Sequence, residues 1–298
     1  MNTSFLDDIR NAFRNGSAVM RFILINIAVF LVVNLFSLFF FLFSVAPEHQ
    51  INLVQWLAVP ADWRDLLHKP WTIITYMFLH QDFFHILSNM IMLYFGGQLF
   101  TEYLGENKFV ATYFLGGIAG AFLYIVVFNT FPAFQSITQF SIALGASASV
   151  LAVFVAIATY LPDFSVNLIL FGPVRLKFIA IVLVGIDLIS IDKGNPGGHI
   201  AHLGGAMYGY LAMTQLKKGR DFSAGFNKVI LWIGNFFKPI ERSKMKVAHK
   251  KTKDDLVYNA QKKAKQESVD KILDKISHSG YESLTKQEKE ELFKMSKE

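Results

Sequence analysis

The chain has 298 residues, of which 53% are hydrophobic and 17% are charged, whereas a soluble domain carries about 25% charged residues. It contains no cysteine, which excludes disulfides, thiol catalysis and cysteine-ligated zinc. The net charge of +6 does not indicate nucleic-acid binding, because basic residues beside membrane spans are expected on the cytoplasmic side. Charges are sparse from 21 to 216 and dense after it, so a membrane body and a water-facing tail are predicted.

A short segment, 1–20, comes before the first apolar run and is expected to lie in the cytoplasm. The run itself, 22–46, has about 25 residues and follows Arg10, Arg14 and Arg21. The apolar region of a signal peptide is shorter, about 7–15 residues. We therefore favour a retained membrane span over a signal peptide.

Six apolar runs have about the length that a membrane-spanning helix needs. They cover residues 21–46, 84–102, 109–130, 145–162, 176–192 and 199–216. The chain is thus predicted to be an all-α membrane protein whose six-helix bundle occupies 21–217. The long connection 47–83 is rich in tryptophan and is expected to form a structured loop at the membrane interface.

The distribution of lysine and arginine predicts the orientation of the bundle. With the N-terminus in the cytoplasm, most basic residues lie in inner segments, and the outer loops carry only Arg64, Lys69 and Lys193. An even number of spans returns the C-terminus to the same side. We expect a multi-pass protein of a bacterial inner membrane, with both termini in the cytoplasm.

The tail, 218–298, is expected to form short helices. Residues 222–237 are amphipathic and 242–253 are basic, so these segments could contact lipid headgroups or a cytoplasmic partner. One helical stripe follows, made of Val269, Ile272, Leu273 and Ile276. Thr285 and Glu288 then have the spacing of a capping box at the start of a last helix. We expect the last two helices to pack on each other.

Polar residues inside membrane spans are costly, so each is a candidate functional residue. Three groups stand out near the starts of the second, fourth and sixth spans: His80, His85 and Asn89; Gly145 to Ser149; and His199, His202, Gly205 and Gly209. From His85, Ser147 and His202 to the inner end of each span is about 15 residues, or about 22 Å in a core about 30 Å thick. These side chains are therefore predicted to share one depth near the outer face.

Together the three groups have the chemistry needed for serine hydrolysis. Ser147 is the candidate nucleophile and His202 the candidate general base, because a serine hydroxyl needs a base that accepts its proton. The backbone N–H of Ser147 is one candidate donor to an oxyanion. His85 and Asn89 are four residues apart on one helix face, and their side chains are further candidate donors.

The glycines around these residues suit the same hypothesis. Gly145 would allow a tight turn at the nucleophile. Gly205 and Gly209 would let the sixth helix pack closely on the fourth. Each group also has a structural alternative, since small residues and a polar anchor are typical of packed membrane helices. The combination of all three groups at one depth favours a catalytic site.

A metal site is the alternative for the histidines, because His199 and His202 could bind an ion together with His80 or His85. No carboxylate falls within these spans at a useful spacing, and there is no His-Glu-x-x-His motif. We therefore predict no metal and no other cofactor. His199 is expected in a loop at the mouth of the site, and His80 is expected to support the site by a hydrogen bond within the outer loop.

At these positions the sequence resembles the rhomboid family. The matching pattern is His80, His85-x-x-x-Asn89, Gly145-x-Ser147 and Ala201-His202-x-x-Gly205-x-x-x-Gly209. The resemblance covers about 21–217 and implies a six-helix bundle that cleaves transmembrane segments of other proteins with a Ser–His dyad and no acidic third member. By this resemblance, Ser147 matches the nucleophile and His202 the base, while His85 and Asn89 match the oxyanion-hole side chains.

Three positions depart from the family pattern. Ala148 follows the serine where many members have glycine, and Leu151 stands where an aromatic residue often stacks on the histidine. Trp71-Thr72 replaces a Trp-Arg pair in the first loop. These changes leave the dyad intact and bear on how the histidine and the first loop are held.

Two other functions compete with proteolysis. A non-catalytic relative would bind transmembrane helices for quality control, but such relatives typically lack the serine or the histidine. A transporter with a histidine proton relay would need carboxylates in mid-span, and Asp187 is the only candidate. The sequence therefore favours an intramembrane serine protease whose partners are transmembrane substrates and the bilayer.

Overall fold

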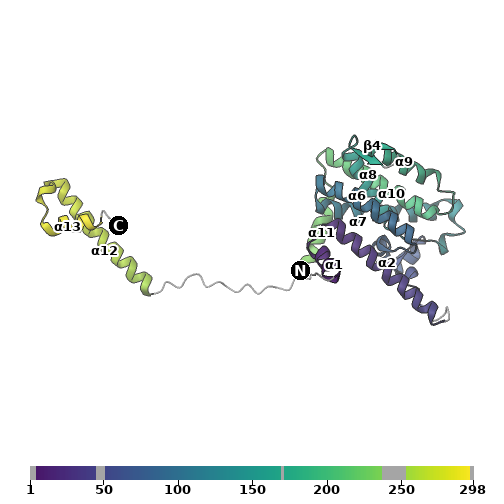
Figure 1. Ribbon diagram of the computed structural model, residues 1–298, viewed down its shortest axis with the longest axis horizontal. Helices are drawn as coiled ribbons and strands as arrows, with labels where there is room; N and C mark the ends of the chain where they lie inside the picture. Colours follow the sequence, from purple (N-terminus) through teal and green to yellow (C-terminus); the bar gives the residue numbers. More distant parts are fainter. Residues whose placement is uncertain (1–4, 45–50, 169–170, 237–252, 296–298) are drawn as a thin grey trace. The chain divides into compact units, whose positions relative to one another are not determined.

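The computed structural model describes residues 5–44, 51–168, 171–236 and 253–295. The chain divides into two compact units, Met1–Phe237 and Lys238–Glu298. The first unit holds all six predicted spans, and the second holds the last two helices (Figure 1).

The six predicted spans are all helices, within a few residues of the expected bounds. They are α2 (Ala18–Leu42), α6 (Phe83–Leu104), α7 (Glu106–Thr130), α8 (Ser147–Tyr160), α9 (Leu176–Ile189) and α10 (Pro196–Lys217). By length and composition, α2, α6 and α7 can each cross a membrane. α8 and α9 have 14 residues each, which is about 21 Å of helix. The predicted all-α membrane bundle is confirmed.

α8 is the centre of this bundle, because it packs against α6, α7, α9 and α10 (Figure 1). Every residue from Ala148 to Ala158 is buried. A helix that is enclosed on all sides needs apolar residues around its whole circumference. Alanine and valine supply most of them here, and their small size lets the neighbouring helices approach closely.

Glycines of α7 and α10 face α8 at backbone distance. A Cβ added to Gly205 would meet the carbonyl oxygen of Ala148, and one added to Gly209 would meet that of Ala152. Gly120 of α7 approaches Ala148 as well. Small residues at such interfaces allow the close van der Waals packing that holds helices together in lipid. The predicted close packing of the sixth span on the fourth is confirmed.

At the N-terminal end of the first unit, α1 (Phe5–Asn15) precedes α2, and Ser17 caps the first turn of α2. The backbone N–H of Ala18 donates to the carboxylate of Glu106 at 3.0 Å. This hydrogen bond places the start of α2 beside the start of α7, which are both predicted inner ends.

The connection between α2 and α6 is a structured loop, as predicted. It contains α3 (Leu53–Leu57), β1 (Val59–Pro60), α4 (Trp63–His68), α5 (Thr72–Thr75) and the 3-10 helix η2 (Tyr76–Phe78). β1 pairs antiparallel with β2 (Ile142–Ala143), with Val59 opposite Ala143. The side-chain amide of Asn129 in α7 donates to the carbonyl oxygen of Ala61 at 2.7 Å. The loop is thus tied to the segment that leads into α8.

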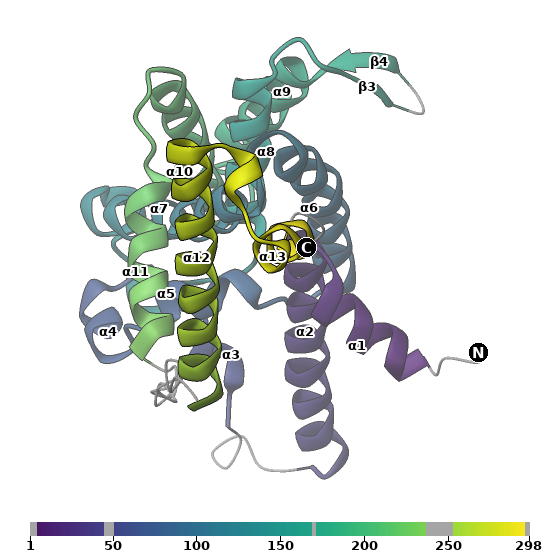
Figure 2. The ribbon, with the colours of Figure 1, turned by 90° about the vertical axis from the view of Figure 1, so that its left-hand side faces the viewer.

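Two further connections flank the short helices. The 3-10 helices η3 (Pro132–Phe134) and η4 (Thr138–Phe140) lie between α7 and β2. A ribbon of β3 (Ser165–Leu168) and β4 (Gly172–Arg175) leads from α8 into α9 and projects from the bundle (Figure 2). At its base, Lys177 donates to Asp163 at 2.7 Å, and this hydrogen bond lowers the pKa of the exposed Asp163 carboxyl.

The amphipathic segment predicted over 222–237 forms α11 (Ser223–Phe236), which runs beside α7 (Figure 2). The rings of Phe226 and Phe114 stack at 5.8 Å, and Lys108 pairs with Asp221 at 3.4 Å. By these contacts α11 belongs with the first unit, although the sequence placed the start of the tail at 218. The boundary between the units falls after Phe237.

The second unit consists of α12 (Lys253–Ser279), η5 (Tyr281–Ser283) and α13 (Lys286–Met295). Ile272 and Leu284 are buried between its elements. The two predicted helices pack on each other, as expected. Most of the basic stretch predicted over 242–253 lies outside the described residues.

Candidate active site

The site begins at the turn that leads into α8. Gly145 has a φ of 127°, a left-handed conformation that favours glycine, and its N–H donates to the carbonyl oxygen of Tyr76 at 2.9 Å. A Cβ at Gly145 would lie 2.9 Å from Cε1 of His85 and 3.5 Å from Oγ of Ser147. The missing side chain of Gly145 therefore leaves room for His85 and Ser147 to face the same small space.

The structure distinguishes the two serines of this segment. Ser147 is the first residue of α8 and remains partly accessible. Ser149 is fully buried, and its hydroxyl points toward Gly117 in α7. Only Ser147 shares a space with His85, so it is the serine that fits a nucleophile.

His202 reaches this region from α10. A Cβ added to Gly120 of α7 would lie 2.7 Å from the Cβ of Ala148 and 2.7 Å from the carbonyl oxygen of Ala201. These two residues are the immediate neighbours of Ser147 and His202. The structure thus brings Ser147, His85 and His202 to one level of the bundle.

His80, near the end of the first loop, supports the turn before α8. Its ring is fully buried, and Nε2 accepts a hydrogen bond from the backbone N–H of Ala146 at 3.4 Å. The centroids of the His80 and His85 rings are 5.1 Å apart. The sequence predicted a hydrogen bond within the outer loop, and the structure directs it to the residue before Ser147 instead.

Asn89 lies one turn after His85 on α6 and is buried. Its side-chain amide donates to the carbonyl oxygen of His85 at 2.9 Å. In this structure the amide is therefore bonded within its own helix. The role of His85 and Asn89 as oxyanion donors stays a prediction.

Asp187 is the site residue that the sequence reasoning did not place. It is buried in α9, and its Oδ1 lies 2.8 Å from Nδ1 of His202 and 2.8 Å from Nδ1 of His199. The sequence has no carboxylate at a useful spacing within the histidines' own spans, but α9 brings Asp187 to α10 across space. The cost of a carboxylate inside a membrane span was the one sequence signal that could have found it.

The same three residues have the composition of a metal site. One ligand atom from each of Asp187, His199 and His202 lies within 4.8 Å of the others. The 2.8 Å from Oδ1 of Asp187 to each Nδ1 is a hydrogen-bonding distance. Both histidines are thus bonded directly to the carboxylate.

The departures from the family pattern have local partners. Leu151 is buried in an apolar cluster that includes Leu176 of α9 and Ala206 of α10.

In the first loop, the hydroxyl of Thr72 donates to the carbonyl oxygen of Lys69 at 2.7 Å. The indole N–H of Trp71 donates to the carbonyl oxygen of Trp56 at 2.8 Å, and the two rings are stacked. The loop is therefore anchored by its tryptophans.

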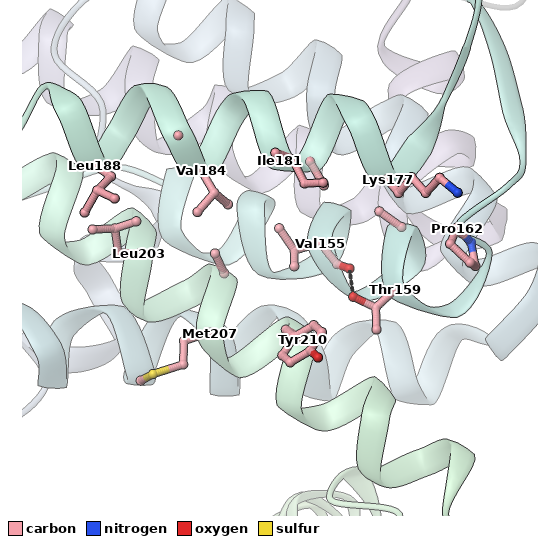
Figure 3. Close-up of a pocket in the computed structure, with 14 residues that line it drawn as sticks. Val155, Thr159, Pro162, Lys177, Ile181, Val184, Leu188, Leu203, Met207 and Tyr210 are labelled. Carbon is pink, nitrogen blue, oxygen red and sulfur yellow. Dashed lines mark hydrogen bonds between the residues drawn. The ribbon is translucent and has the colours of Figure 1, made fainter.

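Two apolar grooves flank α9. One has a volume of about 890 Å³, lies between α6 and α9, and includes Ser88 in its lining. The other has a volume of about 650 Å³ and lies between α9 and α10, with α8 behind it (Figure 3). In Figure 3, α9 and α10 are closest near Leu188 and Leu203 and diverge toward Lys177 and Tyr210.

These features define a helical membrane bundle with a serine and histidines gathered at the start of its enclosed central helix. Residues 67–218, about half of the chain, match the family model of the rhomboid domain. The chain belongs to the rhomboid family. Residues 251–298 match a second model, described as a family of unknown function, DUF6576.

Three curated relatives illustrate the match. The chain is 34% identical to RHOMBOID-like protein 12, mitochondrial, of Arabidopsis thaliana over 158 residues, which are 50% of this chain and 47% of that protein. It is 28% identical to the presenilin-associated rhomboid-like protein, mitochondrial, of Rattus norvegicus over 187 residues, 60% of this chain and 45% of that protein. It is 32% identical to Inactive RHOMBOID-like protein 8 of Arabidopsis thaliana over 85 residues, 28% and 24% of the two chains.

The chain thus spans less than half the length of each of these relatives. Family membership and the apolar helices together identify a membrane protein. The predicted bacterial inner membrane finds no support, because two of these relatives are named as mitochondrial. The relatives also include a protein named as inactive, so membership of the family does not by itself establish proteolysis.

Proposed function

We propose that the chain is an intramembrane serine endopeptidase that cleaves transmembrane segments of other membrane proteins near the outer membrane face. The main support is that His85 and the hydroxyl of Ser147 face one space at Gly145. His202 lies at the same level, since Gly120 approaches the neighbours of both Ser147 and His202.

The chemistry follows from the two side chains. His202 accepts the proton of the Ser147 hydroxyl while Oγ bonds to the carbonyl carbon of the peptide. The C–N bond then breaks, and His202 returns the proton to the leaving amine. Water attacks the resulting acyl-enzyme by the same steps, which frees Ser147 and releases the new carboxyl end.

The oxyanion of each tetrahedral intermediate needs hydrogen-bond donors. The N–H of Ser147 is at the first turn of α8, where backbone N–H groups have no partner within the helix. The His85 ring is directed at the same space. Asn89 would join them by turning its amide away from the His85 carbonyl oxygen.

The groove between α6 and α9 supports a proposed route for the substrate. Its lining is mostly apolar, and it reaches Ser88, next to Asn89 on α6. A transmembrane substrate could approach there from the lipid, unwind near the outer face and present an extended peptide bond. Small side chains at the cleaved bond are expected, because Ala146 and Ala148 are closely packed around the nucleophile.

The remaining partners follow from the topology. Basic residues predicted at the inner face meet neighbouring inner segments, as in the 2.8 Å hydrogen bond from Lys217 to the carbonyl oxygen of Thr159. We propose that both termini face the cytoplasm and that the tail binds lipid headgroups or a cytoplasmic partner. A non-catalytic role in binding transmembrane helices is the second candidate, favoured by the relative named as inactive.

Cleavage of a model transmembrane substrate by the purified full chain tests the proposal. Ser147→Ala and His202→Ala should each lower the rate by about 10³-fold or more, because the dyad acts as a unit. Ser149→Ala is the matched control and should cleave normally, since this buried hydroxyl faces α7. Wild-type cleavage that persists in Ser147→Ala would refute the assignment, and a wild type that binds but never cleaves would favour the non-catalytic role.

A further inference from the structure

The carboxylate of Asp187 lies behind the candidate base. Its Oδ1 is 2.8 Å from Nδ1 of His202 and equally close to Nδ1 of His199. The Asp187 side chain is 10% exposed, whereas the two histidine side chains are 24% and 21% exposed. The acid is thus more buried than either histidine that it contacts.

Asp187 lies on the buried face of α9. Its buried companions on this helix are Leu176 and Ala180, which are 11 and 7 residues earlier and share its face. The opposite face is apolar and exposed, as expected for contact with lipid. A carboxylate within a membrane span is costly unless hydrogen bonds compensate it. Two imidazole N–H groups supply that compensation here, so Asp187 is held toward α10.

This contact determines how the His202 ring can be used. An ionised carboxylate only accepts hydrogen bonds, so Nδ1 of His202 must carry the proton. Nε2 is then unprotonated and able to take a proton from Ser147. When it does, the adjacent carboxylate stabilises the positive charge that forms on the ring. The stacking aromatic residue expected from the family is Leu151 here, and Asp187 provides another means of orienting the ring.

The same contact joins two helices at the level of the site. Figure 3 shows α9 and α10 closest near Leu188 and Leu203. Leu188 follows Asp187 in the sequence, and Leu203 follows His202. Farther along, the helices diverge and leave the apolar groove. The orientation of His202 therefore depends on the outer end of α9.

We propose that Asp187 is a positioning residue for His202, so that this chain uses Ser147, His202 and Asp187 together, with His199 sharing the carboxylate. The proposal rests on the proposed function for its catalytic consequence. The hydrogen bond itself can be tested whether or not the chain cleaves a substrate.

Kinetics of the full chain with a model transmembrane substrate give the first test. Asp187→Asn and Asp187→Leu should lower kcat by about tenfold or more while KM stays within about twofold, because the base is misoriented and substrate binding is not. Asp187→Glu should recover part of the loss. Asp163→Asn is the matched control, since it removes an exposed carboxylate that meets the other end of α9, and it should leave kcat unchanged.

Thermal unfolding separates positioning from a structural role. Removing one partner of a buried hydrogen-bonded group is destabilising, so the Tm of each variant is measured beside its kcat. Asp187→Asn has nearly the volume of the native side chain and keeps an acceptor oxygen, so it should keep a Tm near that of the wild type and still have a low kcat. A loss of activity that follows a fall in Tm would overturn the proposal, as would wild-type kcat in both Asp187→Asn and Asp187→Leu.

The nitrogen spectrum of ¹⁵N-labelled histidine supplies a readout that needs no activity. The His202 signal, assigned by its absence in His202→Gln, should show the Nδ1-protonated tautomer in the wild type and lose it in Asp187→Leu. An unchanged tautomer would overturn the proposal even if Ser147→Ala proves the protease assignment. Loss of wild-type activity with a chelator and recovery with zinc would also overturn it, because Asp187, His199 and His202 would then be metal ligands.

Discussion

The two units of this chain differ in the contacts that join their helices. In the membrane unit, α8 and α10 meet through Gly205 and Gly209, with backbone against backbone. In the C-terminal unit, α12 and α13 are bridged by long charged side chains, as in the bidentate pair of Lys275 and Glu288 at 2.9 Å. Small residues pack helices in lipid, while charged pairs are inexpensive in water and contribute little there.

A polar side chain therefore has a different role in each unit. A carboxylate in α12 or α13 is surrounded by water and serves the local structure. A carboxylate or histidine inside the bundle had to be compensated by specific partners, as Asp187 is by two histidines. Buried polar residues such as Asp187 in the membrane unit therefore have specific partners, whereas those of the C-terminal unit cap helices and form ion pairs.

The largest effect is expected from a methyl group at the backbone contact. Gly205→Ala would push Cβ into the carbonyl oxygen of Ala148, and we expect a loss of about 3 kcal/mol in the free energy of unfolding. Gly185→Ala in α9 is the matched control, because nothing lies within 4 Å of its added Cβ. Unfolding of both variants in detergent measures the difference. Equal stability of the two would break the comparison between the units.

An intermediate effect is expected from a buried hydroxyl of the membrane unit. Tyr113 donates to the carbonyl oxygen of Met77 at 2.9 Å and is fully buried. Tyr113→Phe should cost about 1–3 kcal/mol, because the carbonyl oxygen loses its partner away from water. The exposed Tyr210→Phe should change the unfolding free energy by less than about 0.5 kcal/mol. A neutral Tyr113→Phe would show that this buried bond contributes nothing.

The smallest effect is expected in the C-terminal unit, at Glu288. Hydrogen bonds from Lys275 and then from Thr285 lower the pKa of Glu288 to about 2 from 4.5. Because the pKa in the folded state is depressed, the stabilisation is present above about pH 4.5 and is lost as the pH falls through about 2. The ¹³Cα shifts of Lys286–Met295 in the full chain should therefore lose helical character over this range.

Glu288→Gln should show the reduced helical shifts already at pH 7 and should respond less to acid. Glu290→Gln changes the same charge two residues along α13 and is the matched control. Identical pH curves for Glu288→Gln and the wild type would contradict the capping role of this carboxylate.

Much of the fold could be predicted from the sequence, because the length and apolar character of a span are local properties. The six helices and the capping box of Thr285 and Glu288 are of this kind. The gathering of Ser147, His85 and His202 was also within reach, since depth in a membrane can be counted in residues. Close packing could be inferred from Gly205 and Gly209.

What could not be predicted depends on contacts between distant segments. The pairing of β1 with β2 joins parts of the chain about 80 residues apart and leaves no periodic signal in such short strands. The contacts of Asp187 could not be predicted, because its histidines are 12 and 15 residues away on another helix. The assignment of α11 to the first unit likewise depends on Phe114 and Phe226 meeting in space.

The enclosure of α8 by its neighbours has a consequence for the height at which Ser147 sits. A helix that touches lipid adjusts its tilt or depth when the bilayer becomes thicker or thinner. α8 is buried along almost its whole length, so acyl chains cannot pull on it directly. The position of the nucleophile is therefore set by the helices around α8. Its distance from the inner ends of those helices should stay the same in bilayers of different thickness.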